Sequence, residues 1–164
     1  MWQIRKRADV QCRELADRHY NRQSIGAALF VPPGRCVVLF AETDTGRAYW
    51  ASSWPYAEYV MHAWAGAWIC SAFRNEGAGL SSSLITSAVA CTRQVWGEPP
   101  DIGMITFVDE SKVKPKAHPG FCYLKAGFKK IGYTKGGLIA LQLLPNEMPP
   151  PAEPLGFQRT LEFG

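Results

Sequence analysis

The chain has 164 residues, which is enough for one domain with a hydrophobic core. Hydrophobic residues make up 47% of it and charged residues 20%, as in folded soluble proteins, and no apolar run approaches the roughly 18 residues that cross a membrane. The net charge of +4 permits a nucleic-acid partner without demanding one.

The first half of the chain predicts one helix and then a β-hairpin. Residues 8–20 carry a weak apolar face, formed by Val10, Leu15 and Cys12, and are typical of a helix. The apolar run 36–40 predicts a buried strand, and residues 48–51 predict the returning strand after a turn signal at 44–46. The aromatic-rich residues 53–66 show no clear periodicity, which leaves both a loop and a short helix open there.

The second half predicts alternating strands and helices. The apolar run 67–70 indicates a buried strand, and residues 81–96 carry the clearest helical pattern, ended by Gly97. The elements that follow are a strand at 102–108, a basic loop at 112–120, a short helix at 121–126, and paired strands at 129–134 and 138–144. We therefore expect an α/β domain over residues 1–145, with a central mixed β-sheet flanked by helices, and an extended proline-rich tail over residues 146–164.

The five cysteines are an odd number, and no two of them form a Cys-x-x-Cys motif. This usage is typical of a reducing compartment and disfavours zinc held by paired cysteines. The basic residues at the start of the chain are not followed by the apolar segment of a secretory signal. We therefore expect a cytoplasmic protein without a metal and without membrane association, and the sequence leaves a homodimer open.

An Arg-x-x-Gly-x-Gly sequence joins the strand at 67–70 to the long helix. Glycine lets the backbone approach a ligand closely, and the N–H groups of a helix N-terminus favour an anion such as a phosphate. The candidate cofactor-binding residues are Arg74, Gly77, Gly79, Ser81 and Ser82. A plain tight turn, in which Ser81 caps the helix, is an equally good interpretation of the same residues.

Two motifs in this order resemble the GNAT family of N-acetyltransferases. The first is the glycine turn from Arg74 to Gly79, and the second is the stretch from Phe121 to Phe128 with its Tyr-x-x-x-Gly-Phe pattern. In that family the first motif holds the pyrophosphate of acyl-CoA, and the second forms a short helix beside the thioester. The resemblance covers about residues 67–144 and implies a GNAT-like fold with acyl-CoA, such as acetyl-CoA, as the donor.

A further set of short sequences resembles the Mom family within that fold, the DNA-modification proteins of bacteriophage Mu and related phages. These sequences are His19-Tyr20, Phe73-Arg74-Asn75, Trp96-Gly97-x-Pro99-Pro100, Gly103 to Asp109, Pro119 to Tyr123 and Thr134 to Gly137. Mom proteins alter the exocyclic N6 of adenine in DNA to a carbamoylmethyl-type adduct, which blocks restriction enzymes. The resemblance therefore implies an acyltransferase-like enzyme acting on DNA in the host cytoplasm. Simple acyl transfer to N6 would give an amide instead of that adduct, so the resemblance does not fix the donor.

Candidate catalytic residues lie on both sides of the glycine turn. The GNAT resemblance makes Tyr123 a general acid for a departing thiolate, and a ring buried for packing is the alternative. Asp109 follows a strand end, where α/β folds place ligands, and could take a proton from an amine, cap a helix or pair with Lys112. His19 and Tyr20 end the first helix, where a histidine can move protons near neutral pH or interact with the helix dipole.

Nucleic-acid contacts are predicted for basic and aromatic residues. Lysines of the basic loop could bind backbone phosphates, and aromatic residues could stack on an extruded adenine. The candidates are Lys112, Lys114, Lys116, Trp54 and Tyr56. The alternatives are lysines placed over the cofactor and aromatic residues packed in the core. Basic residues concentrate in residues 1–35 and 109–135, which would form a phosphate-binding patch if they met on one face.

The sequence thus supports three hypotheses of function. The first is a phage-type transferase that modifies adenine in DNA. The second is a generic acetyl-CoA-dependent N-acetyltransferase for a small amine or peptide. The third is a catalytically inactive DNA-binding module.

Overall fold

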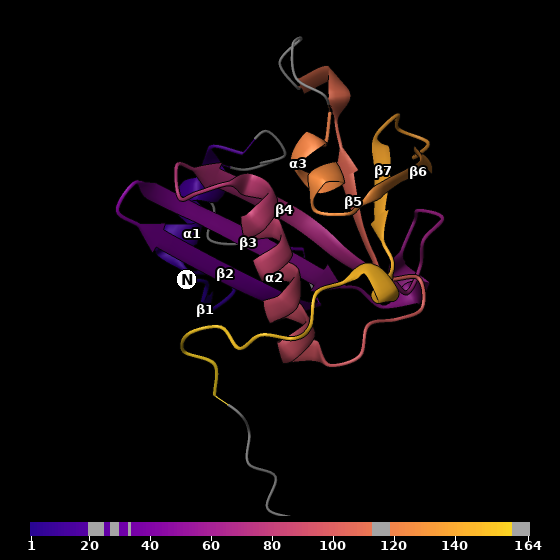
Figure 1. Cartoon of the computed structure of the whole chain (residues 1–164). Coiled ribbons are helices and arrows are strands. Elements are labelled where there is room, and N and C mark those ends of the chain that lie inside the picture. Colours follow the sequence, from indigo (N-terminus) through magenta and orange to yellow (C-terminus); the bar gives the residue numbers. More distant parts are fainter. Residues whose placement is uncertain (20–24, 27–29, 33, 113–118, 159–164) are drawn as a thin grey trace, which may run out of the picture.

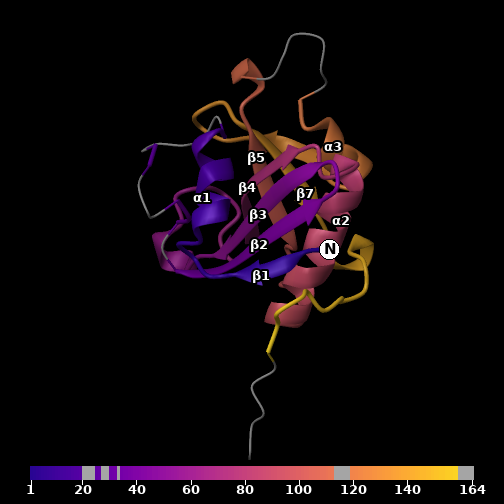
Figure 2. The same ribbon diagram turned by 90° about the vertical axis from the view of Figure 1, so that its left-hand side faces the viewer.

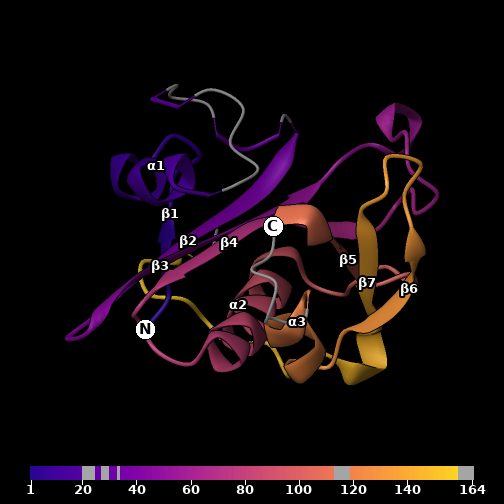
Figure 3. The same ribbon diagram turned by 90° about the horizontal axis from the view of Figure 1, so that it is seen from above.

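One mixed β-sheet runs through the protein, with helices on both of its faces. The computed structural model describes residues 1–19, 25–26, 30–32, 34–112 and 119–158. Within these residues the sheet has seven strands in the order β1-β2-β3-β4-β5-β7-β6. Helix α1 (Val10–Asp17) lies on one face, and helices α2 (Ser81–Trp96) and α3 (Phe121–Lys125) lie on the other (Figures 2 and 3). The predicted α/β class, with a central mixed sheet between helices, is therefore confirmed.

The first four strands form an antiparallel meander. They are β1 (Gln3–Arg5), β2 (Arg35–Thr43), β3 (Gly46–Trp54) and β4 (Trp68–Glu76). The predicted hairpin is confirmed with longer strands, because β2 and β3 pair from Arg35–Trp54 to Thr43–Gly46. The sequence assigns residues 73–76 to the glycine turn, but they belong to β4, because Arg74 and Asn75 pair with Tyr49 and Ala48 of β3.

The remaining strands are β5 (Met104–Val108), β6 (Lys129–Tyr133) and β7 (Ile139–Leu143), close to their predicted positions. Strands β4 and β5 are parallel and pair at three positions, from Trp68–Met104 to Cys70–Thr106. Beyond Cys70, β4 continues along β3 whereas β5 continues along β7, so the two strands diverge (Figure 1). A shift of register beside Ser71 accompanies this divergence. We call the point where β4 and β5 separate the fork.

Helix α2 spans Ser81–Trp96 as predicted, and Gly97 ends it with a φ of +82°. Helix α1 is shorter than the predicted 8–20, and its buried side is formed by Cys12, Leu15 and Ala16. Val10, which the sequence assigns to the apolar face, is 55% exposed. No helix in the described part of the chain combines the length and the apolarity needed to cross a membrane.

Asp9 caps the first turn of α1. Its Oδ2 accepts a hydrogen bond from the N–H of Cys12 at 3.0 Å, and its Oδ1 accepts one from Arg5 at 3.1 Å. We expect Asp9→Ala to lower the free energy of unfolding by about 1 kcal/mol, because the helix loses its capping acceptor. Asp9→Asn keeps an oxygen acceptor, so its free energy of unfolding, measured with urea at neutral pH, should fall by less. Equal losses in the two variants would contradict the capping role.

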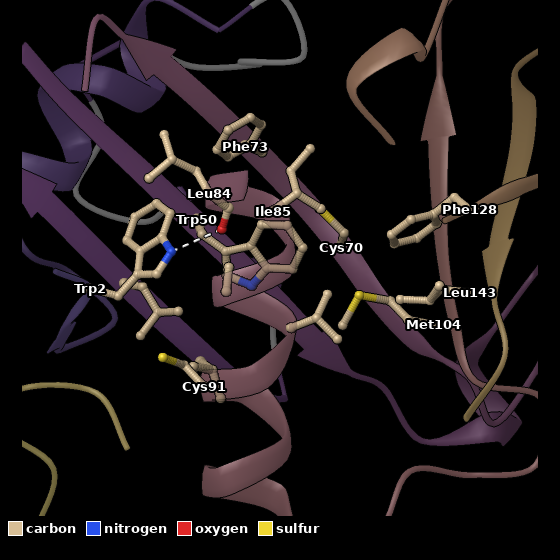
Figure 4. Packing of buried hydrophobic residues seen from close by; sticks show 14 of the residues in the cluster. Trp2, Trp50, Cys70, Phe73, Leu84, Ile85, Cys91, Met104, Phe128 and Leu143 are labelled. Carbon is tan, nitrogen blue, oxygen red and sulfur yellow. Dashed lines mark hydrogen bonds between the residues drawn. The ribbon is translucent and has the colours of Figure 1, made fainter. Parts of the chain in front are cut away.

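The sheet has a hydrophobic core on each face. Between the sheet and α2, the side chains of Trp2, Trp50, Leu84 and Ile85 are almost completely buried (Figure 4). The indole Nε1 of Trp2 donates a hydrogen bond to the carbonyl of Leu84 at 3.0 Å, which ties the chain just before β1 to α2. On the other face, α1 packs on β2 and β3 through residues such as Leu15.

The proline-rich segment after η3 (Pro145–Glu147) crosses the C-terminal half of α2 and runs to β1 (Figure 1). The N–H of Ala152 donates to the carbonyl of Ala90 at 3.1 Å. The N–H of Leu155 donates to the carbonyl of Trp2, and the N–H of Ile4 donates to that of Leu155, both at 2.9 Å. Up to residue 158, the segment expected as a tail therefore packs on the domain, and Leu155 pairs with the outer edge of β1.

Candidate functional site

The turn between β4 and α2 is held together by Asn75. Its Oδ1 accepts a hydrogen bond from the N–H of Ala78 at 2.9 Å. Its Nδ2 donates to the carbonyl of Gly79 at 2.7 Å and to Oγ of Ser81 at 2.9 Å. One amide side chain thus fixes the path of the backbone into the helix.

The N-terminus of α2 is not capped by a side chain at its N-cap residue. That residue is Leu80 and not Ser81, which corrects the capping role considered for Ser81. Gly77, with a φ of +84°, is required in the turn, because a Cβ there would lie 2.9 Å from the carbonyl oxygen of Thr45. Gly79, with a φ of +153°, has open space around it. The first-turn N–H groups of Ser81 to Ser83 therefore present the positive end of the helix dipole beside an open glycine.

Arg74 is part of an ion-pair network. Its Nε donates to Oε2 of Glu76 at 2.5 Å, and Arg18 donates to both oxygens of Glu76 at 2.7 Å. The sequence predicts Arg74 as a cofactor-binding residue, whereas in the structure its Nε binds Glu76. The hydrogen bonds from Arg18 and Arg74 lower the pKa of Glu76 from 4.5 to about 2.

Because of this lowered pKa, the free energy of unfolding depends on pH. Because Glu76 has a lower pKa in the folded state, its contribution is complete above pH 4.5 and is lost as the pH falls towards about 2. Between pH 4.5 and 2 the free energy of unfolding should therefore decline. We expect Glu76→Gln to remove the part of this decline that Glu76 causes, measured by urea unfolding at a series of pH values. Glu98→Gln, which changes a 91% exposed carboxylate, should leave the decline unchanged. Parallel curves for wild type and Glu76→Gln would contradict the assignment.

Tyr123, on α3, lies at the fork. Its hydroxyl is 3.6 Å from Sγ of Cys70, and its ring packs edge-on against Phe73 and Phe128 with centroids 6.4 and 5.5 Å away. Oγ1 of Thr106 donates to the carbonyl of Cys70 at 3.2 Å, at the last paired position of β4 and β5. The phenol hydroxyl is therefore placed where the two strands separate.

The protonation states at the fork follow from burial. Burial raises the pKa of Tyr123 well above its ordinary value, so the phenol stays protonated through neutral pH. Burial also raises the pKa of Cys70 to about 12, so this side chain is a neutral thiol and not a nucleophilic thiolate. Tyr123 can thus act as a proton donor, whereas Cys70 is unsuited to covalent catalysis.

A cavity of about 470 Å³ lies on the face of the sheet opposite α2, and we call it cavity 1. Ile69 and Ser71 line it, and they alternate along β4 with Trp68 and Cys70, which face the core beneath α2. Cys70 also borders cavity 1, which therefore reaches the fork, and Sγ of Cys70 lies 3.6 Å from the hydroxyl of Tyr123 on the side of α2.

Asp109 follows β5 and lines cavity 1, as does Lys112. Oδ1 of Asp109 accepts hydrogen bonds from the N–H and the Oγ of Ser111, at 3.1 and 2.6 Å. Asp109 therefore both caps the turn η2 (Glu110–Lys112) and places a carboxylate in the cavity wall. A carboxylate in that position can accept a proton from an amine.

His62 lines cavity 1, although the sequence favours His19. His19 follows α1 and is not among the described residues that line the cavity. Nδ1 of His62 accepts a hydrogen bond from the N–H of Trp64 at 3.0 Å, and burial lowers the pKa of His62. From this hydrogen bond we infer a neutral ring with its proton on Nε2, which makes His62 a hydrogen-bond donor. The aromatic richness of residues 53–66 was the one sequence signal for this part of the site.

The aromatic candidates for base stacking differ in their surroundings. The ring of Trp54 lies 4.0 Å from the guanidinium of Arg35, and Trp68 and Trp96 pack against it with centroids 5.7 and 5.5 Å away. These contacts place Trp54 in the packing beneath α2. Tyr56 is 59% exposed and stays a candidate. Tyr20, Lys114 and Lys116 lie outside the described residues.

The two basic segments of the sequence do not form one continuous patch over the described residues. Strands β1 and β6 lie at opposite edges of the sheet, which separates Arg5 from Lys129. The segments meet instead at cavity 1, which is lined by Pro32 from the first and Lys112 from the second.

Among the described residues, no three His, Cys, Asp or Glu side chains are grouped as metal ligands would be. Comparison of the chain with protein-family models, with curated proteins and with solved structures finds no match. The function is therefore argued from the geometry of the fork and of cavity 1.

Proposed function

We propose that the protein is a GNAT-like transferase that moves a group from a phosphate-bearing, acyl-CoA-like donor to the exocyclic N6 of adenine in DNA. The observation that carries the proposal is the fork. There, a protonated Tyr123 on one face of the sheet approaches Cys70, which borders an open cavity on the other face. Two reactants could therefore approach each other from opposite faces of the sheet.

The donor would lie between α2 and the fork. Its phosphates would bind the first-turn N–H groups of α2 beside Gly79, and its reactive end would reach Tyr123. Six strand positions separate Cys70 from Glu76 at the end of β4, which is roughly 20 Å at about 3.3 Å per residue. A donor with a long extended arm between phosphate and reactive carbon, as CoA has, fits this separation. The order of strand, glycine turn, α2, β5 and α3 is the order that the GNAT resemblance implies.

The acceptor would enter cavity 1. Phe107 gives the cavity an aromatic wall, and His62 and Asp109 add a hydrogen-bond donor and a carboxylate. Such a combination suits a flat heteroaromatic ring with an exocyclic amine better than a flexible alkyl amine.

In the proposed reaction Asp109 accepts one proton and Tyr123 donates one. N6 forms a bond to the donor carbon and loses one proton to Asp109, while the bond from that carbon to the leaving group breaks. The leaving group takes its proton from Tyr123. Because the lone pair of N6 is delocalised into the purine ring, N6 is a weak nucleophile, and a carboxylate beside it assists the attack.

The mass of adenosine in plasmid DNA tests the proposal. The protein is expressed in bacteria with a plasmid, and the plasmid is digested to nucleosides for mass spectrometry. We expect a mass-shifted adenosine with the wild type, and its loss with Asp109→Ala and Tyr123→Phe. Acetyl-CoA turnover with small amines and unmodified DNA would support a generic N-acetyltransferase instead. Salt-dependent DNA binding without any product would support a DNA-binding module.

A further inference from the structure

A second cavity of about 430 Å³ adjoins cavity 1, and we call it cavity 2. The two cavities share Met61, His62, Phe107 and Leu138 as lining residues. Trp64, from the segment between β3 and β4, lines cavity 2 on its aromatic side. Residues 133–136, at the end of β6 and in the turn before β7, line it as well and include the exposed Lys135. A continuous groove therefore runs from the fork to the turn between β6 and β7.

Three rings form the wall at the junction of the cavities. The centroid of His62 lies 5.1 Å from that of Phe107 and 6.0 Å from that of Trp64, and Trp64 and Phe107 are 5.9 Å apart. All three side chains are partly exposed, so core packing does not cover their surfaces completely. Partly exposed aromatic faces on a cavity wall are what nucleobases stack on in single-strand-binding proteins.

We propose that cavity 2 binds the nucleobase adjacent to the adenine held in cavity 1, so that the groove holds two consecutive bases of one single-stranded segment. This inference rests on the proposed function, because cavity 1 takes the reacting adenine there. Trp64 stacks on the flanking base, and His62 and Phe107 separate the two bases.

The charges along the groove fit a nucleic-acid strand as its occupant. Lys112 lines cavity 1, and Lys135 lines cavity 2. A strand with one base in each cavity has its backbone phosphates near both lysines. Nε2–H of His62 can donate to a ring nitrogen or a carbonyl oxygen of either base, because its Nδ1 is occupied by the N–H of Trp64.

Trinucleotides with single abasic positions test the inference without any donor. The reference ligand has a central adenine flanked by thymines, and two matched ligands carry an abasic site on the 5′ or the 3′ side with all phosphates kept. Affinities are measured by isothermal titration. For the wild type we expect one abasic ligand to bind roughly tenfold more weakly than the reference, which corresponds to the loss of one base–aromatic stack.

Variants assign the effect to cavity 2. Trp64→Ala should bind the reference ligand as weakly as the wild type binds the abasic ligand, and Trp64→Phe should restore most of the difference. Phe121→Ala removes a 52% exposed ring outside both cavities and should bind as the wild type does. Equal affinities of the wild type for all three ligands would overturn the inference, whatever the folding of the variants.

The two proposals can fail separately. A flanking-base effect without modified adenosine in cells would overturn the proposed function and leave base binding in cavity 2 standing. Modified adenosine with no flanking-base effect would overturn the inference for cavity 2 alone.

Discussion

Tyr123→Phe is expected to lower the kcat of group transfer by roughly 10²–10⁴-fold, with little change in the KM for the donor. The substitution removes the hydroxyl that lies 3.6 Å from Sγ of Cys70 at the fork, and with it the group proposed to protonate the leaving group. The ring contacts with Phe73 and Phe128 stay in place, so the melting temperature should change little. Steady-state kinetics on an adenine-containing oligonucleotide, with the donor identified from the adenosine mass shift, would measure this.

Tyr49→Phe is the matched control for this change. Tyr49 lies on β3, is 1% exposed, and packs edge-on against Phe30 in the core beneath α1, among residues that line neither cavity. Removal of this hydroxyl should leave kcat within a factor of about two, as expected for a hydroxyl that donates no proton in the reaction. Wild-type kcat in Tyr123→Phe would rule out this tyrosine as the general acid.

Trp2→Ala is expected to lower the free energy of unfolding by about 3–5 kcal/mol. Trp2 is 1% exposed, and its indole is hydrogen-bonded to Leu84 of α2, so the change leaves a cavity and removes a hydrogen bond between the sheet and the helix (Figure 4). Denaturant unfolding followed by circular dichroism would measure the loss.

Two further variants serve as a comparison and a control for Trp2→Ala. Trp2→Phe keeps much of the buried ring but loses the hydrogen bond, and it should cost less than Trp2→Ala. Val10→Ala, at a 55% exposed position of α1, should change the free energy of unfolding by less than about 0.5 kcal/mol. A loss below about 1 kcal/mol for Trp2→Ala would show that this end of the chain contributes little to the core.

Elements with a strong local pattern were predictable from sequence. The bounds of α2 follow from its apolar periodicity and from Gly97. The presence of the β2–β3 hairpin follows from the apolar run 36–40 and the turn signal at 44–46, although both strands are longer than predicted. The positions of Tyr123 on a short helix and of Asp109 after a strand end were predictable for the same reason, because turn residues mark both places.

Features that depend on contacts between residues far apart in the sequence were not predictable. Strand β1 has three residues, and its place depends on β2 on one side and Leu155 on the other. The extension of β4 to Glu76 depends on pairing with β3, which polar residues such as Arg74 and Asn75 do not signal. The role of His62 depends on its contact with Phe107, 45 positions further along the chain, and no spacing rule connects them.

The fork is also a weak point in the backbone pairing of the sheet. Strands β4 and β5 are joined at three paired positions, whereas β2 and β3 are joined along their whole length. Because few hydrogen bonds must break there, we expect the backbone beside the fork to open locally while the core that both halves of the sheet, β1–β4 and β5–β7, share beneath α2 stays packed. Backbone amides of β4 and β5 near Cys70 and Thr106 would then exchange with solvent earlier than those of β2 and β3. The same small opening would let an extended ligand enter between the two halves without unfolding either of them.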